Sequence, residues 1–162
     1  MFKITSEAEF RDVFRPIDRK ELQLPTDLRF PMLVRGTMAW VEPGGHRTFL
    51  VFEDPNKKAL RGVVFKRSSG ASDVATMCDF CHSVRGTSSV GMLTATIDKK
   101  RRVGVVACSD LSCQAKLDEK IPSVNDLRES LRPDQKRNFL LERINGFADN
   151  HLEWPIAIQF QS

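Results

Sequence analysis

The chain has 162 residues, of which 41% are hydrophobic and 28% charged, so it can bury a core and is too balanced in composition for a disordered protein. Its 25 Lys and Arg residues exceed its 21 Asp and Glu residues, and the net charge of +4 permits a phosphate-bearing partner without requiring one. No stretch approaches the ~20 apolar residues of a membrane span, and the N-terminus has no apolar run of signal-peptide length. We therefore expect a single domain over residues 1–162, in the cytoplasm and with no membrane partner.

The first patterned segment predicts a short helix over residues 6–18. Ser6 and Glu9 form a capping box, in which each side chain satisfies an amide of the first turn. Pro16 is expected to bend or shorten the last turn. Apolar side chains recur at the spacing of one helix face, at Phe10, Val13, Phe14 and Ile17.

Residues 30–67 predict antiparallel strands. Three apolar, β-prone runs, 30–42, 49–52 and 60–66, are separated by turn sequences that contain Pro, Gly, Asn and Asp. Connections this short cannot make the crossovers that parallel strands need, so we expect an antiparallel meander.

Four cysteines follow as two closely spaced pairs, Cys78 with Cys81 and Cys108 with Cys113. A structural zinc site is closed by four protein ligands in tetrahedral geometry. In the cytoplasm, where we expect this protein, reducing conditions disfavour structural disulfides. The spacing therefore predicts one structural Zn²⁺ held by these four cysteines, within a zinc-finger region over residues 76–120.

The segments between and after the pairs explain how the sulfurs meet. Residues 89–97 and 103–107 predict two strands of a hairpin, and the second strand leads directly to Cys108. Residues 111–120 predict a short helix with Cys113 near its start. A knuckle, a hairpin and a helix that carries the last ligand make up a treble clef.

Other chemistry is open to the first pair. Cys78 to His82 reads C-x-x-C-H, the form used for covalent haem attachment, and C-x-x-C is also the form of a redox dithiol. Both readings leave Cys108 and Cys113 without a role. Four unliganded buried cysteines are the remaining alternative. His82 is the natural substitute if one cysteine is not a ligand.

The last third of the chain predicts helices over residues 123–152, followed by an apolar tail. Pro133 suits the first turn of the second helix, where its missing amide costs nothing. The whole chain is therefore expected to have an α+β fold, with an antiparallel meander sheet, a treble-clef four-cysteine zinc finger and C-terminal helices.

A zinc ion held by four thiolates leaves no position for an activated water, and the chain has no nucleophile elbow, P-loop or paired-carboxylate pattern. We expect a binding protein, not an enzyme, and no small-molecule substrate. The densest charge is the run of Lys99, Lys100, Arg101 and Arg102 at the predicted hairpin tip, which is either a solvated turn or a contact for RNA phosphates or an acidic protein. Phe80, between two ligands, either packs on the core or is displayed as an anchor.

With these elements in place, the chain resembles the C-terminal treble-clef domain of the elongation factor G-binding proteins, which include the fusidic-acid-resistance proteins. The resemblance rests on Met77 to Cys81, Val105 to Cys113 and the helix from Lys136 to Phe147, and it covers about the span from Phe30 to Leu152. The resistance proteins also carry an N-terminal helical bundle, whereas the residues before Phe30 leave room for one short helix.

The resemblance implies that the chain binds the translational GTPase elongation factor G and promotes its release from the ribosome, which in the family rescues translation stalled by fusidic acid. By position, Phe80, Lys116 and Phe147 would contact the partner. The alternative is an RNA- or ribosome-binding zinc finger that uses Lys99 to Arg102.

Overall fold

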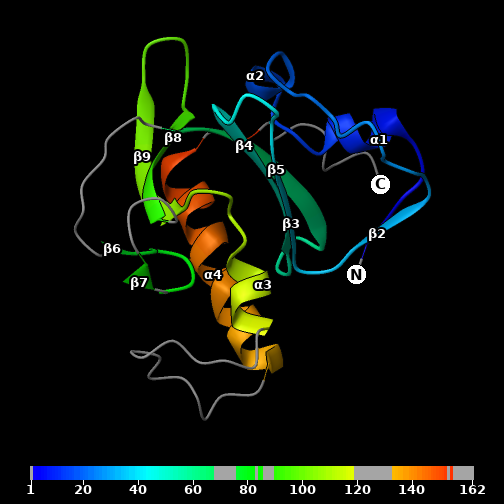
Figure 1. Cartoon of the computed structure of the whole chain (residues 1–162). Coiled ribbons are helices and arrows are strands. Elements are labelled where there is room, and N and C mark those ends of the chain that lie inside the picture. Colours follow the sequence, from blue (N-terminus) through cyan, green and yellow to red (C-terminus); the bar gives the residue numbers. More distant parts are fainter. Residues whose placement is uncertain are drawn as a thin grey trace.

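A computed structural model describes residues 2–67, 76–82, 84–85, 90–118, 133–152 and 154. Its centre is a five-stranded antiparallel sheet with the order β3-β4-β5-β8-β9 (Figure 1). The predicted meander and the α+β fold class are confirmed, although the first predicted run, 30–42, holds two strands that belong to different sheets and are separated at Gly36, whose φ is 74°. The strands are β3 (Thr37–Val41), β4 (Arg47–Asp54), β5 (Ala59–Arg67), β8 (Val90–Thr96) and β9 (Arg102–Cys108).

Smaller elements lie around this sheet. The strand β1 (Phe2–Ile4), which the sequence did not predict, pairs with β2 (Met32–Val34), and β6 (Thr76–Met77) pairs with β7 (Val84–Arg85). The helix α3 (Cys113–Asp118) begins at the last cysteine, and α4 (Pro133–His151) begins at the predicted proline. The helix predicted before Pro133 and most of the apolar tail lie outside the described residues. No helix in the described ranges is long and apolar enough to cross a membrane.

The helix predicted over residues 6–18 is two short helices, α1 (Glu7–Asp12) and α2 (Pro16–Arg19). Its start is as expected, because the Ser6 hydroxyl accepts a hydrogen bond from the Glu9 amide at 3.2 Å. The break falls at Arg15, whose ψ of 147° is extended, because a proline excludes helical geometry from the residue before it. The prediction of one helix was wrong because this local effect of Pro16 ends it.

The strands β4 and β5 are buried on both faces, because their side chains alternate between two cores. On one face, Leu50, Phe52 and Phe65 pack with the cysteines and with α4. On the other, Phe49 and Val51 pack with the N-terminal segment. Figure 1 shows α4 on one side of the sheet and α1 and α2 on the other. Burial on both faces explains why β4 contains an uninterrupted apolar run at residues 49–52.

Gly62, on β5, lets the N-terminal segment approach the sheet. Its amide donates to the Val13 carbonyl at 3.0 Å, and a Cβ added to Gly62 would lie 2.8 Å from the nearest ring atom of Phe14. Phe14 is buried, so its ring has little room to move. This contact excludes any side chain at position 62.

Gly62→Ala should therefore destabilise the protein by about 1–3 kcal/mol, as overpacking of a core does. Gly146→Ala is the matched control, because a Cβ at Gly146 of α4 meets nothing within 4 Å. Replacing a helical glycine should stabilise the fold by up to about 1 kcal/mol. Urea unfolding measures the free energy of unfolding of both variants. A change of the same sign in the two would contradict this account of Gly62.

Candidate metal centre

The four cysteines meet at one buried point. Cys78 and Cys81 lie in the turn after β6, Cys108 ends β9, and Cys113 begins α3. Their four sulfur atoms all lie within 4.8 Å of one another, and none of the four forms a disulfide. Antiparallel pairing of β8 with β9, which sets Val90 opposite Cys108, delivers the third sulfur to this point.

Backbone contacts fix the first knuckle against the hairpin. The Asp79 amide donates to the Val106 carbonyl at 2.8 Å, and the Asp79 carboxylate accepts from the Val106 amide at 3.3 Å. The amides of Phe80 and Cys81 point at the Cys78 sulfur, at 3.4 and 3.5 Å. Such N–H donors orient a thiolate ligand and stabilise its negative charge.

The second knuckle is held by its own turn and by the sheet. The Leu111 amide donates to the Cys108 carbonyl at 2.9 Å, and Leu111 takes a left-handed φ of 52°. Asp110 accepts hydrogen bonds from the Ser112 amide and hydroxyl, which closes the turn. From β4, the buried Thr48 hydroxyl donates to the Ser109 carbonyl at 2.7 Å. The position of Cys113 therefore depends on the sheet as well as on the knuckle.

The distances between the sulfurs fit zinc. Cys78 and Cys113 are 3.7 Å apart, and Cys81 and Cys108 are 3.6 Å apart, measured between Sγ atoms. Four thiolates placed tetrahedrally at ~2.3 Å from one ion would be separated by about 3.8 Å. The predicted set of Cys78, Cys81, Cys108 and Cys113 can thus hold one structural Zn²⁺ with little rearrangement.

The pKa values of the thiols also favour a bound metal ion. Hydrogen bonds from Cys108 and Cys113 lower the pKa of the Cys78 thiol, whereas hydrogen bonds to Cys108 and Cys78, together with burial, raise the pKa of the Cys113 thiol. One thiolate is therefore favoured by its neighbours, and a second is opposed. A divalent cation is what allows all four sulfurs to ionise together.

Redox and haem readings of the first pair do not fit this arrangement, because all four sulfurs converge on one point. The metal-ligating group found within the described residues consists of the four cysteines. His82 lies outside that group, and its amide donates to the Cys78 carbonyl at 2.9 Å from a left-handed φ of 61°.

Comparison with known proteins agrees with this geometry. The profile of the FBP C-terminal treble-clef zinc-finger family matches residues 9–150, which include all four ligands and all of α4 except His151. The chain belongs to this family. No curated protein sequence matches the chain.

A solved structure shows the same fold in a larger protein. It is the structure of the fusidic acid resistance protein FusC, with a TM-score of 0.51 and 16% sequence identity. The match covers 94% of this chain and 60% of the FusC chain. The likeness concerns the fold, and the treble-clef zinc finger predicted from the cysteine spacing is confirmed by the family match.

Phe80 is not displayed. Its side chain is 2% exposed, and its ring packs edge-to-face against Phe147 with the centroids 5.8 Å apart. Arg143 of α4 donates a hydrogen bond to the Phe80 carbonyl. The tight turn between the two ligands thus directs the ring into the core, which is the first of the two alternatives that the sequence left open for Phe80.

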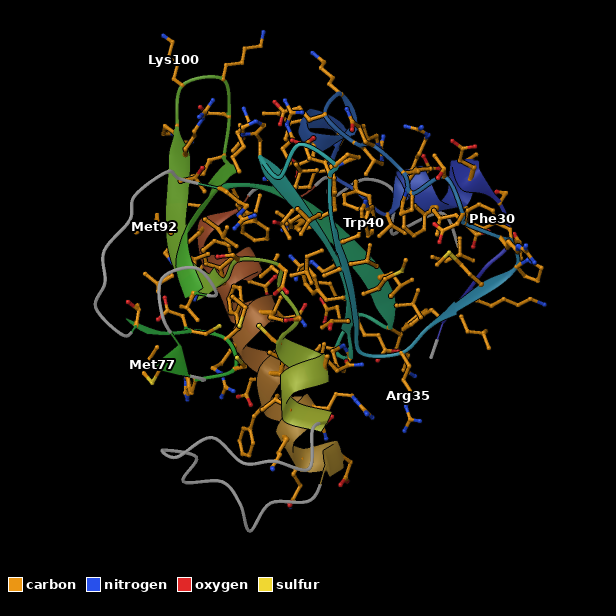
Figure 2. The ribbon with its side chains drawn as sticks, in the orientation of Figure 1. Phe30, Arg35, Trp40, Met77, Met92 and Lys100 are labelled. Atoms are coloured by element: carbon orange, nitrogen blue, oxygen red, sulfur yellow. The ribbon has the colours of Figure 1, made fainter. Side chains whose placement is uncertain are left out.

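The other predicted contact residues lie in two separate places. Phe147 is half-buried on α4, in contact with Phe65 and Phe80. Lys116 lies on α3, and its side chain is outside the described residues. The exposed basic run Lys99 to Arg102 forms the predicted hairpin tip, and Figure 2 shows Lys100 extending from it, far from Met77 beside the first knuckle. Their roles in binding stay predictions.

Sequence reasoning missed one exposed aromatic residue on α4. Phe139 is 43% exposed and lies eight residues before Phe147 on α4, with Arg143 midway between them. Residues four apart share a helix face, so these three side chains form one stripe, which we call the α4 stripe. Spacing of four along the predicted helix was the signal that could have found it.

Proposed function

We propose that this chain is a zinc-stabilised protein-binding module whose partner is elongation factor G. The observation that carries the proposal is the family match over residues 9–150, which spans the sheet, the zinc finger and α4. The resemblance to elongation factor G-binding proteins supplies the partner. FusC, which shares the fold, is a fusidic acid resistance protein. By the same resemblance, binding would promote release of the factor from the ribosome.

The chemistry of the metal centre supports binding over catalysis. Four thiolates complete a tetrahedral zinc site, so no coordination position remains for a substrate or an activated water. The ligands are also buried, with Cys78 and Cys108 each 0% exposed. In this proposal the zinc holds two knuckles, a hairpin and a helix in register, and the partner contacts the surface that they support.

The α4 stripe is the surface that we assign to the partner. Arg143, the middle residue of the stripe, donates a hydrogen bond to the Phe80 carbonyl and so connects the stripe to the first knuckle. Aromatic and arginine side chains dominate the binding energy of protein interfaces, and this stripe offers Phe139, Arg143 and Phe147. Phe80 does not contact the partner in this proposal; its buried ring supports Phe147, which packs against it.

Capture of elongation factor G from a bacterial lysate tests the proposal. Phe139→Ala should reduce recovery of the factor about tenfold, because truncating an interface anchor costs about 1–2 kcal/mol. The variant should keep its fold, since Phe139 is exposed.

Leu33→Ala is the matched control. Leu33 is an apolar residue on β2 and is 64% exposed, and Figure 1 shows β2 on the opposite side of the molecule from β6 and β7. It should leave recovery of the factor unchanged. Recovery by the wild-type protein no greater than by an unrelated four-cysteine zinc domain would defeat the proposal, and equal losses in the two variants would remove the α4 stripe from it.

A further inference from the structure

A second surface lies at the far end of the β8–β9 hairpin from the zinc centre. There the hairpin tip, the end of α2 and the strand β5 surround a hollow of about 440 Å³, which we call the basic groove. In Figure 1 the tip is at the opposite end of the molecule from the first turns of α4. The basic residues that line the groove are Lys20, Lys66, Lys99, Lys100, Arg101 and Arg102.

The groove carries the net charge of the whole protein. The groove is lined by six of the 25 Lys and Arg residues and by two of the 21 Asp and Glu residues, Glu21 and Asp98. The rest of the chain therefore has 19 basic and 19 acidic residues and no net charge. A net charge of +4 on a protein of this size is modest when it is spread evenly. Concentrated on one concave surface, it gives a strong local positive potential.

Both acidic residues of the groove are already engaged. Glu21 accepts ion pairs from Lys66 at 3.2 Å and from Arg47 at 3.6 Å. Asp98 accepts the Lys100 and Arg101 amides and the Arg101 guanidinium, and these bonds hold its pKa below the ordinary value. They also fix the shape of the hairpin tip.

The remaining cations of the groove have no such neutralising partner. Within the described part of the chain, no ion pair involves Lys20, Lys99, Lys100 or Arg102, and all four side chains are exposed. Like charges held close together on a preformed surface repel one another. A polyanion that enters the groove relieves this repulsion and releases its own counterions.

We propose that the basic groove binds the phosphate backbone of structured RNA, independently of sequence. Lysine is depleted in protein interfaces, whereas four of the six cations here are lysines, and Ile17 is the one apolar side chain among the described lining residues. This composition favours a nucleic acid over a protein. No aromatic residue lines the groove in the described ranges, so it lacks the stacking platform of single-strand binders, and a base-paired backbone fits it better.

This inference differs from the prediction that the hairpin tip alone contacts RNA. Lys20 comes from the end of α2 and Lys66 from β5, so three segments distant in sequence contribute to one surface. The groove is also separate from the α4 stripe, and its ligand does not depend on elongation factor G binding.

A blunt RNA duplex of about 16 base pairs, the length that double-stranded RNA-binding domains span, is a suitable probe. Binding of the full chain is measured by fluorescence anisotropy over a series of salt concentrations. The triple variant Lys99→Ala/Lys100→Ala/Arg102→Ala should weaken binding at least about tenfold and reduce the slope of log K against log salt by about 2–3, because each lost phosphate contact removes a little under one from the slope. Arg101 is kept, because its bond to Asp98 shapes the tip.

Two further variants make the test specific to the groove. Lys20→Ala alone should weaken binding about threefold and lower the slope by about one, although it leaves the hairpin tip intact. The triple variant Lys3→Ala/Arg29→Ala/Lys57→Ala removes the same charge from exposed positions outside the groove and should change affinity less than about twofold.

Several results would overturn the proposal. They are absence of wild-type binding to the duplex at low salt, equal losses in the two triple variants, and full affinity in Lys20→Ala, which would reduce the site to the tip. Loss of elongation factor G capture by the groove variant, with duplex binding unchanged, would show instead that the groove is a protein surface.

Discussion

Cys108→Ser should release the zinc and unfold the protein. The sulfur of Cys108 is buried, lies 3.6 Å from that of Cys81, and connects the end of β9 to the knuckle that leads into α3. Structural zinc supplies about 10–16 kcal/mol to small domains, which equals or exceeds the whole stability of a typical protein, about 5–15 kcal/mol. Because the metal and the fold are coupled, the two should be lost together.

Elemental analysis and far-ultraviolet circular dichroism measure these two losses. The wild-type protein should carry one zinc per chain, and a chelator should unfold it. Ser112→Ala is the matched control: Ser112 lies in the same knuckle and hydrogen-bonds Asp110, so its loss should cost about 1 kcal/mol and no zinc. Full zinc content and wild-type stability in Cys108→Ser would refute the metal centre.

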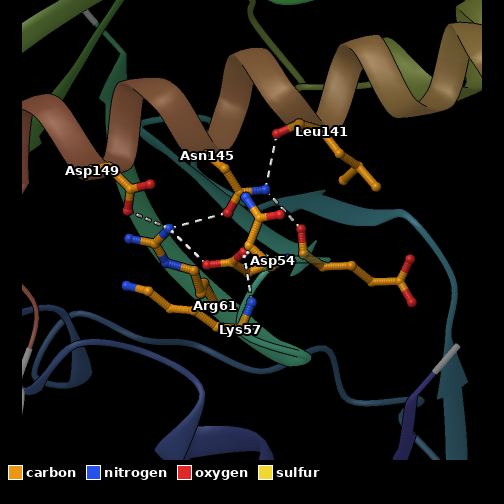
Figure 3. Close-up of polar contacts among 8 residues, drawn as sticks. Asp54, Lys57, Arg61, Leu141, Asn145 and Asp149 are labelled. Carbon is orange, nitrogen blue, oxygen red and sulfur yellow. Dashed lines mark hydrogen bonds and ion pairs between the residues drawn. The ribbon is translucent and has the colours of Figure 1, made fainter.

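Arg61→Ala should destabilise the protein by about 3–5 kcal/mol, the cost of leaving one member of a buried ion pair alone. The Arg61 guanidinium extends from β5 toward α4, where it pairs with Asp149 at 2.9 Å and with Asn145 at 3.1 Å (Figure 3). It also pairs with Asp54 of β4 at 3.4 Å and stacks over Trp154 with its central carbon 4.2 Å from the ring centroid. This network fastens α4, and with it the α4 stripe, to the sheet.

The two carboxylates of the network should respond differently. The side chain of Asp54 is 3% exposed, so Arg61→Ala strands a buried charge there, whereas that of Asp149 is 51% exposed and is well solvated without a partner. Asp149→Ala should therefore change the free energy of unfolding by less than about 1 kcal/mol. Urea unfolding of both variants measures the difference. Equal costs would show that the pairing with Asp54 contributes little.

Features set by local sequence were predictable. The spacing of Cys78, Cys81, Cys108 and Cys113 indicated the metal and its ligands, because two short turns can aim their sulfurs at one point in few ways. Short connections required antiparallel pairing, and Pro133 marked the start of α4.

Features set by tertiary packing were not predictable. Whether Phe80 faced the core or the solvent depended on α4, which begins more than fifty residues later and supplies Phe147 and Arg143. Arg61 and Asn145 are 84 positions apart, and no periodicity relates them. The basic groove has the same origin, since the hairpin tip was visible in the sequence but its neighbours Lys20 and Lys66 were not.

Titration of purified elongation factor G with the purified, zinc-loaded protein tests the central claim most directly. Isothermal calorimetry should show saturable binding with one protein per factor, weaker binding by Phe139→Ala, and unchanged binding by Leu33→Ala and by the basic groove triple variant. Absence of binding at tens of micromolar, by a protein that is folded and carries one zinc per chain, would contradict the claim.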